Sequence, residues 1–153
     1  MKSRFSSFSA EVLGVETGRL GLTPLASTPW PSANRALFLP FSLGSPAVIS
    51  DLGITNGTAV SGHVDAGVYD SNFQRLTSTK GIKQAGNNKT QQIALSQVSL
   101  APGPYWLALV FDNTTSTIMA LGGLAGTQAE QIGLFEVPNA YPLPPTVTPT
   151  TPS

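Results

Sequence analysis

Glycine and proline interrupt this chain so often that long helices have little room to form. The sequence of 153 residues contains 15 glycines and 13 prolines. Both residue types are poor helix formers, and both recur in the tight turns between short strands. We therefore predict an all-β fold. The length suits one domain with extended ends.

Strand signals follow one another closely from Arg35 to about Leu121. Seven stretches combine apolar or alternating side chains with flanking turn residues, namely Ala36–Ser42, Ala47–Thr55, Gly62–Tyr69, Phe73–Ser78, Thr90–Val98, Pro104–Phe111 and Thr115–Leu121. Short strands at this spacing favour an antiparallel β-sandwich. We place the sandwich body at residues 35–137.

Three connectors carry specific turn chemistry. Asn56-Gly57 is expected to supply the positive φ of a tight turn, and Asp70-Ser71-Asn72 favours an Asx turn. Pro102-Gly103 is expected to bend the chain before the next strand.

Two strands differ in how their faces are predicted to be buried. Alternation in Gly62–Tyr69 places Val64, Ala66 and Val68 on one face, as in a half-buried strand. The other face would carry His63, Asp65, Gly67 and Tyr69. Tyr105–Phe111 is apolar on both faces, which is typical of a central strand covered by a neighbouring subunit or a folded-back arm.

The two ends of the chain look different from the body. Residues 1–34 contain three prolines and little periodicity, and they predict an extended N-terminal arm with at most one short strand. Residues 138–153 form a Pro/Thr-rich tail that should be extended and held by a partner. We expect the body to fold without Tyr141–Ser153.

Charge is scarce, since only 10% of residues are charged against about 25% in ordinary domains. Eight Lys and Arg balance eight Asp and Glu, which argues against nucleic-acid binding. A surface so poor in charge is a solubility liability unless another subunit covers it, so we expect an obligate assembly. No apolar stretch is long enough for a membrane span, and the start of the chain does not resemble a signal peptide.

Three blocks resemble small structural proteins of tailed-bacteriophage particles. They are WPSANRALFLPFSL at 30–43, NGTAVSGHVDAGVYD at 56–70 and LAPGPYWLAL at 100–109. The resemblance implies a jelly-roll-like sandwich in the virion, trimeric as in many decoration and fibre proteins, and it implies no enzymatic activity. The ends of the chain lie outside these blocks.

Ionisable residues provide few starting points for a catalytic or metal site. His63, the only histidine, and Asp65 begin a metal or general-base site, but the sequence contains no cysteine and no second histidine to complete it. Asp65, Asp70 and Asp112 are candidates for a calcium site, although such residues more often cap turns. Asp65 and Asp112 are the one plausible carboxylate pair for a sugar-cleaving enzyme. We favour no catalytic residue, cofactor or metal.

Aromatic residues offer either a sugar-stacking platform or interface anchors. The platform would consist of Trp30, Tyr69, Trp106 and Tyr141. We favour anchoring, with a candidate interface made of Trp30, Trp106, Tyr141, Pro144 and Pro145.

A polar loop at 79–89 carries Lys80, Lys83 and Lys89. It could contact an acidic neighbour, but the plainer interpretation is a solvated hairpin tip. N-x-T sequons occur at Asn56, Asn88 and Asn113, but without a secretory signal they do not predict glycosylation.

The leading hypothesis is a trimeric decoration (cement) protein on the outer surface of a phage head, whose N-terminal arm and Pro-rich tail lie across neighbouring subunits. Its partners would be further copies of the chain and other virion subunits such as the major capsid protein. The alternative is a tail-fibre or tail-tip adhesin subunit that binds a host glycan through its loops. Neither hypothesis involves a membrane.

Overall fold

The computed structural model describes residues 25–121 and 133–148. Within these ranges the chain forms strands and no helix, which confirms the all-β prediction. The strands are β1 (Leu25–Pro29), β2 (Ala36–Leu43), β3 (Ala47–Thr55), β4 (His63–Asp70), β5 (Arg75–Ser78), β6 (Ile82–Lys83), β7 (Thr90–Leu100), β8 (Gly103–Phe111), β9 (Thr117–Leu121) and β10 (Phe135–Val137).

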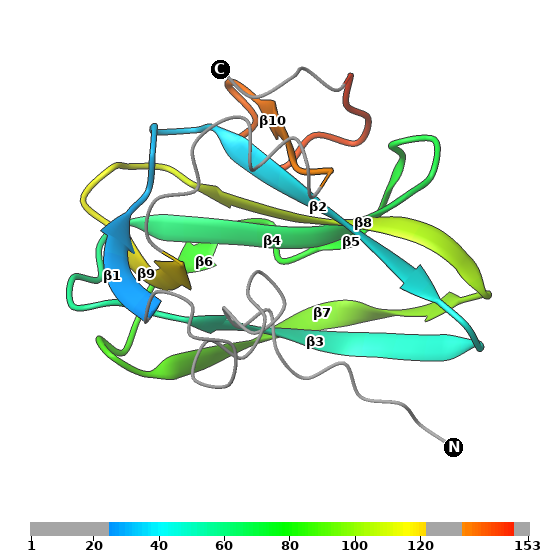
Figure 1. Cartoon of the computed structure of the whole chain (residues 1–153), viewed down its shortest axis with the longest axis horizontal. Coiled ribbons are helices and arrows are strands. Elements are labelled where there is room, and N and C mark those ends of the chain that lie inside the picture. The colour runs from blue at the N-terminus through cyan, green and yellow to red at the C-terminus, as the bar shows by residue number, and fades with distance from the viewer. Residues whose placement is uncertain (1–24, 122–132, 149–153) are drawn as a thin grey trace.

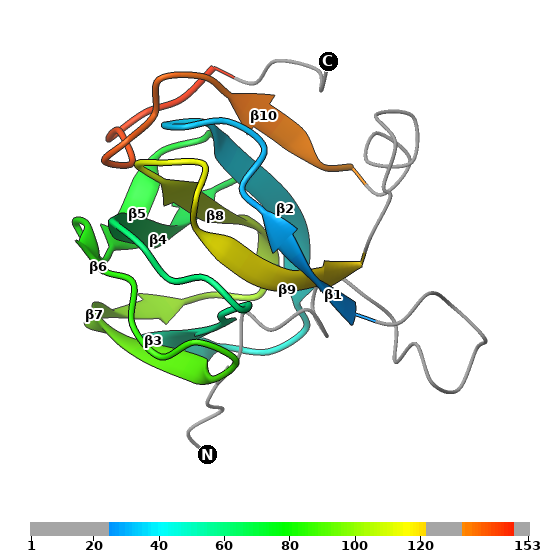
Figure 2. The same ribbon diagram turned by 90° about the vertical axis from the view of Figure 1, so that its left-hand side faces the viewer.

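The strands form two packed layers, and all their pairings are antiparallel (Figure 1). The larger sheet has the order β10-β2-β8-β4-β5, and β6 also pairs with β4. β3 and β7 form a separate sheet, the β3–β7 pair, which lies below the large sheet in Figure 1. The short pair β1 and β9 closes one end (Figure 2). The structure is therefore the predicted β-sandwich, and the jelly-roll assignment remains a prediction.

The main core fills the space between the two layers. Ile49, Leu52 and Ile54 of β3 and Ile93 of β7 are buried against side chains of the large sheet. Val64, Leu107, Leu109 and Phe111 are among the residues that the large sheet contributes. Inward-facing positions alternate along β3 and β7, as in half-buried strands, except at the register shift between Ile49 and Asp51.

Trp30 belongs to this core and not to a surface. Its side chain is 2% exposed, and its ring packs against Phe111 at a centroid distance of 4.8 Å. The indole N–H donates to the Arg35 carbonyl oxygen over 2.9 Å. The prediction that Trp30 anchors an interface is therefore wrong, because a side chain with almost no accessible surface cannot contact a partner.

All seven predicted strands are present, with ends shifted by a few residues. No end shifts by more than two residues, and β5, for example, begins at Arg75 and not at Phe73. The cause is the predicted Asx turn, in which the Asp70 carboxylate accepts from the backbone N–H of Asn72 and of Gln74, both at 2.9 Å. The short strands β6 and β10 were not predicted, and β1 is the one short strand expected in the N-terminal arm.

The prediction for Asn56-Gly57 is wrong. Neither residue has a positive φ. Gly57 is required for space, because a Cβ there would lie 2.3 Å from Ser27 Oγ and 2.4 Å from Thr117 Oγ1. Pro102-Gly103 does bend the chain, and Gly103 has a φ of 150°.

The predicted half-buried face of β4 is also wrong, because every residue from Val64 to Tyr69 is buried. The face that carries Asp65 and Tyr69 is covered by part of residues 133–148, a segment that we call the strap. β8 has the predicted central position, between β2 and β4, and Leu107–Phe111 is buried on both sides. The folded-back arm expected over this strand is the chain's own C-terminal region.

Part of the predicted tail therefore packs with the body. Ala140, Leu143 and Val147 are buried in a second apolar cluster between the strap and the large sheet. Its other buried members are Ala36, Phe38, Tyr69, Ala108, Val110 and Phe135. The remainder of the predicted arm, residues 1–24, and of the predicted tail, residues 149–153, lies outside the described residues.

Candidate functional site

The strap crosses the outer face of the large sheet, on the side opposite the β3–β7 pair (Figures 1 and 2). It begins with β10, which pairs with β2 through Phe135↔Phe38 and Val137↔Ala36. Ala140 N–H then donates to the Asn34 carbonyl oxygen at 2.7 Å, and the chain continues across β4 and β5. We call the surface of β4 and β5 that receives Leu143–Pro145 the strap groove.

Backbone groups of Leu143–Pro145 are bound by three side chains and one main-chain group of the strap groove. The Leu143 N–H donates to Asp65 Oδ2 at 2.9 Å, and the Leu143 carbonyl accepts from Arg75 Nη1. The Pro144 carbonyl accepts from the Tyr69 phenol at 2.6 Å. The Pro145 carbonyl accepts from the Arg75 backbone N–H at 2.8 Å.

Asp65 is a fully buried carboxyl group, with 0% of its surface exposed. Thr79 Oγ1 donates to its second oxygen at 2.8 Å and in turn accepts from the Ala66 N–H at 3.0 Å. A buried carboxyl group is costly unless its oxygens are hydrogen-bonded, and here both are. Asp65 therefore holds the strap and does not form the predicted site with His63.

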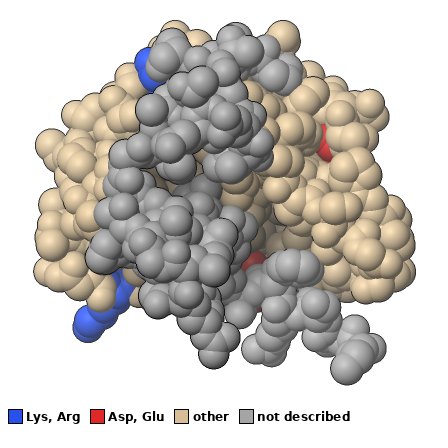
Figure 3. Space-filling model, in the orientation of Figure 1, with Lys and Arg blue, Asp and Glu red and all other residues tan. Residues whose placement is uncertain are grey.

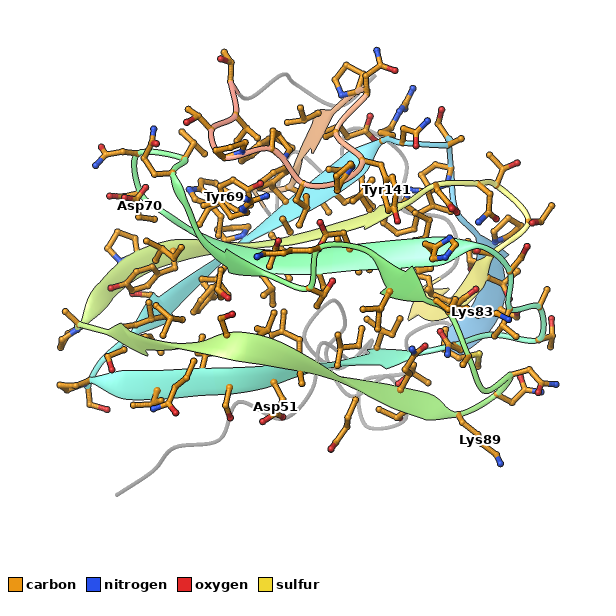
Figure 4. The ribbon with its side chains drawn as sticks, turned by 180° about the vertical axis from the view of Figure 1, so that it is seen from behind. Asp51, Tyr69, Asp70, Lys83, Lys89 and Tyr141 are labelled. Atoms are coloured by element: carbon orange, nitrogen blue, oxygen red, sulfur yellow. The ribbon has the colours of Figure 1, made fainter. Side chains whose placement is uncertain are left out.

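Tyr69 is buried beneath the strap (Figure 4). Burial raises the pKa of its phenol well above the ordinary value, and the charge of Asp65 acts in the same direction, while Arg75 opposes it. A phenol that stays protonated is a permanent donor, which is what the Pro144 carbonyl requires.

Close contact is possible because Gly67 lies under Leu143. A Cβ at Gly67 would lie 3.0 Å from Leu143 Cδ1 and 2.7 Å from the Thr77 carbonyl oxygen. The Leu143 side chain is 1% exposed. The glycine in the middle of β4 therefore gives the leucine a pocket in the sheet.

An aromatic group flanks the strap groove. Phe73 stacks on Trp106 at 5.4 Å, and the edge of Phe135 approaches Trp106 at 4.8 Å. Phe73 has a φ of 60°, a conformation that is unfavourable for an aromatic residue. Phe73 and Trp106 are both partly exposed, and Phe73 lies within the otherwise polar turn Asp70–Gln74.

Four of the five predicted interface residues meet on this side of the molecule. Trp106 and Tyr141 pack against the second cluster, and Pro144 and Pro145 lie in the strap. Burial raises the pKa of Tyr141, and the charges of Asp112 and Asp65 add to that effect. The predicted sugar platform is not assembled, because Tyr69 is buried beneath the strap and Trp30 belongs to the other cluster.

The sequence did not reveal the strap-binding role of Asp65, Arg75 and Gly67. Asp65 lies between Val64 and Ala66 in a strand whose apolar residues alternate. That pattern is equally typical of a carboxylate facing solvent. Only the distant strap, which no local pattern reveals, distinguishes the two cases.

His63 pairs with Asp112, a residue of the β8–β9 connection, and not with Asp65. Its Nδ1 lies 3.1 Å from Asp112 Oδ2, and its backbone N–H donates to Asp112 Oδ1 at 2.9 Å. Partial burial opposes the ionisation of Asp112, but hydrogen bonds from His63 and Asn113 outweigh it and lower the pKa of Asp112. The pair joins the start of β4 to the end of β8.

The three aspartates proposed for calcium have separate roles. Asp65 binds the strap, Asp70 caps a turn and Asp112 binds His63. Over residues 25–121 and 133–148 no three histidine, aspartate or glutamate side chains gather as a metal site would require. Asp65 and Asp112, the carboxylate pair considered for a sugar-cleaving enzyme, also lie in different places. Asp65 is in the strap groove, and Asp112 follows the end of β8.

The predicted solvated tip at 79–89 is only partly correct. Lys80, Lys83 and Lys89 are exposed, and Lys83 and Lys89 lie at one end of the molecule (Figure 4). Gln84 between them is 2% exposed and donates to Asn56 Oδ1 at 2.9 Å and to the Thr117 carbonyl at 3.1 Å. Asn56, the first predicted sequon, is itself buried within this network.

Comparison with models of known protein families, with curated protein sequences and with solved structures finds no match for this chain. No helix among the described residues is long and apolar enough to cross a membrane.

Proposed function

We propose that the protein is a non-enzymatic structural subunit of a tailed-phage particle, in first place a decoration protein on the exterior of the head. The observation that carries this proposal is the chemistry of the outer face of the β3–β7 pair. Its exposed side chains are small or amidic and almost without charge: Ser50, Thr90, Gln92, Ala94, Ser96, Gln97 and Ser99.

A face of this kind suits a permanent protein contact. Burying uncharged hydroxyl and amide groups costs less than burying Lys or Glu, since no full charge loses its hydration. Asp51 is the charged residue of β3, and its carboxylate accepts from Ser50 Oγ at 2.9 Å. Figure 3 shows another view of the surface, where Lys, Arg, Asp and Glu atoms are sparse among the described residues.

Several ionisable side chains in the rest of the described chain support the same proposal. Asp65 and Arg75 hold the strap, and Asp112 holds His63. Arg35 pairs with Glu136 of β10 at 2.9 Å, which fixes the strap to the start of β2. These groups are engaged in holding segments of the chain together, as a structural subunit requires.

The proposed partners are further copies of the chain, in a trimer, and the major capsid protein. Mass spectrometry of phage particles purified by density gradient from a host that carries this gene tests the function. We expect peptides of this chain in amounts comparable to those of other structural subunits. Particles of full infectivity that contain no such peptides would overturn the proposal.

A tail-fibre or tail-tip adhesin is the second candidate, and the partly exposed pair of Phe73 and Trp106 favours it. An aromatic face beside the polar side chains of Asp70–Gln74 is the combination that stacks on and hydrogen-bonds a sugar. Tryptophan fluorescence titrated with host surface glycan tests it. Saturable change that Trp106→Ala abolishes would favour the adhesin, and a flat titration would exclude it.

A further inference from the structure

The strap groove recognises a short peptide backbone completely. Leu143 has one N–H and one carbonyl, whereas Pro144 and Pro145 each have only a carbonyl, since proline has no N–H. All four of these polar groups have a partner on β4 or β5. A groove that leaves no polar group of its occupant unpaired has the properties of a peptide-binding site.

The groove also contacts the side chains of this segment. Leu143 enters the pocket above Gly67, and the two prolines hold the chain in an extended conformation with little entropy to lose on binding. Beyond them Gln74 and Thr146 form an antiparallel bridge, and Thr146 Oγ1 donates to Gln74 Oε1 at 2.9 Å. The ligand class is therefore an extended Leu-Pro-Pro peptide.

These contacts do not depend on which copy of the chain supplies the strap. The groove residues belong to β4 and β5, far from the strap in sequence, and residues 122–132 separate Leu121 of β9 from Gly133. Eleven residues reach roughly 36–40 Å when extended. A segment on such a connection is a low-cost element to exchange between identical subunits.

We propose that the strap groove is a binding site for extended Leu-Pro-Pro peptides, and that it takes the strap of a second copy of this chain in trans. The inference goes beyond the proposed function, because it concerns the purified chain whether or not the chain is part of a phage particle.

A labelled peptide with the sequence of residues 138–148, PNAYPLPPTVT, tests the site. It is titrated into the full chain carrying Leu143→Ala, which weakens the chain's own occupant, with folding checked by circular dichroism. We expect saturable binding by this variant and binding at least tenfold weaker to the wild-type chain, whose groove is filled. A peptide in which aspartate replaces the leucine should bind at least tenfold more weakly than the original.

Disulfide trapping tests the second copy as the ligand, in a chain without native cysteine. Gln74→Cys with Thr146→Cys joins the groove to the strap. Thr55→Cys with Thr90→Cys is the matched control, since these partners lie within the β3–β7 pair. Under oxidation we expect interchain disulfides that increase with protein concentration for the first pair and intrachain disulfides for the control.

Each readout can overturn its half of the proposal. A folded Leu143→Ala chain that does not bind the peptide would remove the peptide site. Exclusively intrachain disulfides in the Gln74→Cys, Thr146→Cys double variant at every concentration would remove the second copy as the ligand. Neither result bears on whether the chain is found in phage particles, so failure here is distinguishable from failure of the proposed function.

Discussion

Gly57 is a residue whose role is to leave space, because its position is closed by side chains from two other segments. A Cβ would meet Ser27 Oγ and Thr117 Oγ1 well inside contact distance. We predict that Gly57→Ala lowers the free energy of unfolding by about 1–3 kcal/mol, as overpacking usually does. Gly44→Ala is the control, since nothing lies within 4 Å of a Cβ there. Equal urea midpoints for the two variants would contradict this account.

Leu143 is the residue that fixes the strap. Its side chain is 1% exposed between the strap and Gly67. Removing a buried leucine side chain costs about 2–5 kcal/mol, so Leu143→Ala should shift the urea midpoint strongly. Leu76→Ala is the matched control, because Leu76 is 38% exposed and its loss should change stability by less than about 0.5 kcal/mol. A Leu143→Ala midpoint as high as the control's would show that the strap does not pack as described.

Asp112 should make stability depend on acid. Although partial burial opposes its ionisation, hydrogen bonds from His63 and Asn113 hold the folded-state pKa below the unfolded value. A lowered carboxyl pKa stabilises the fold above the unfolded pKa, about 3.9, and the contribution is lost as the pH falls through the folded pKa. We predict that Asp112→Asn reduces the loss of stability between pH 6 and pH 2. Urea melts with the same pH slope in both proteins would refute this.

Residues 138–148 of the strap belong to the segment that was predicted from the sequence to be a tail. Because Ala140, Leu143 and Val147 are buried, deleting residues 140–153 should expose the second cluster. Burial of the leucine and valine alone predicts a loss of about 3–6 kcal/mol in the free energy of unfolding. The sequence predicted that the body stays folded without Tyr141–Ser153, whereas the buried Leu143 and Val147 predict a strongly destabilised body.

Chemical denaturation followed by tryptophan fluorescence measures the effect of the deletion. Thr148→Ala, at an exposed position near the end of the strap, is the control and should leave the midpoint unchanged. If the shortened chain unfolded at the same denaturant concentration as the full chain, the strap would contribute nothing to the core.

Strands were predicted well from the sequence because each gives a local signal. β3, for example, has the predicted bounds Ala47–Thr55, between turn residues on both sides. The short strands β6 and β10 give no such signal, since β6 has two residues and β10 follows a Gly-rich stretch. Their pairing is decided by β4 and β2, to which they are bound.

The candidate site was predicted in part. Trp106, Tyr141, Pro144 and Pro145 lie on the same side of the molecule, and their role as an interface with a partner stays a prediction. Asp65 was assigned to the wrong partner, because alternation along one strand cannot reveal a covering segment 78 residues away. The hydrogen bond to Leu143 is a tertiary contact, and a single sequence carries no record of it.

At the scale of the whole molecule, charge is both sparse and balanced. The described residues contain Arg35, Arg75, Lys80, Lys83 and Lys89 against Asp51, Asp65, Asp70, Asp112 and Glu136. Several of these form contacts within the chain, and Asp51 is the charged residue of β3 among the hydroxyl, amide and methyl groups of the outer face of the β3–β7 pair. Such a molecule is suited to permanent association, and this is the physical basis of the proposed structural role.

The position of the protein on purified phage particles tests the central claim most directly. Asn87 is exposed, and in a chain without cysteine Asn87→Cys provides a single site for a gold label. Imaging by electron microscopy should show label distributed over the head, as a decoration protein requires. Label confined to the tail would select the adhesin instead, and particles without label, although the labelled chain is made in the host, would contradict a structural role in the virion.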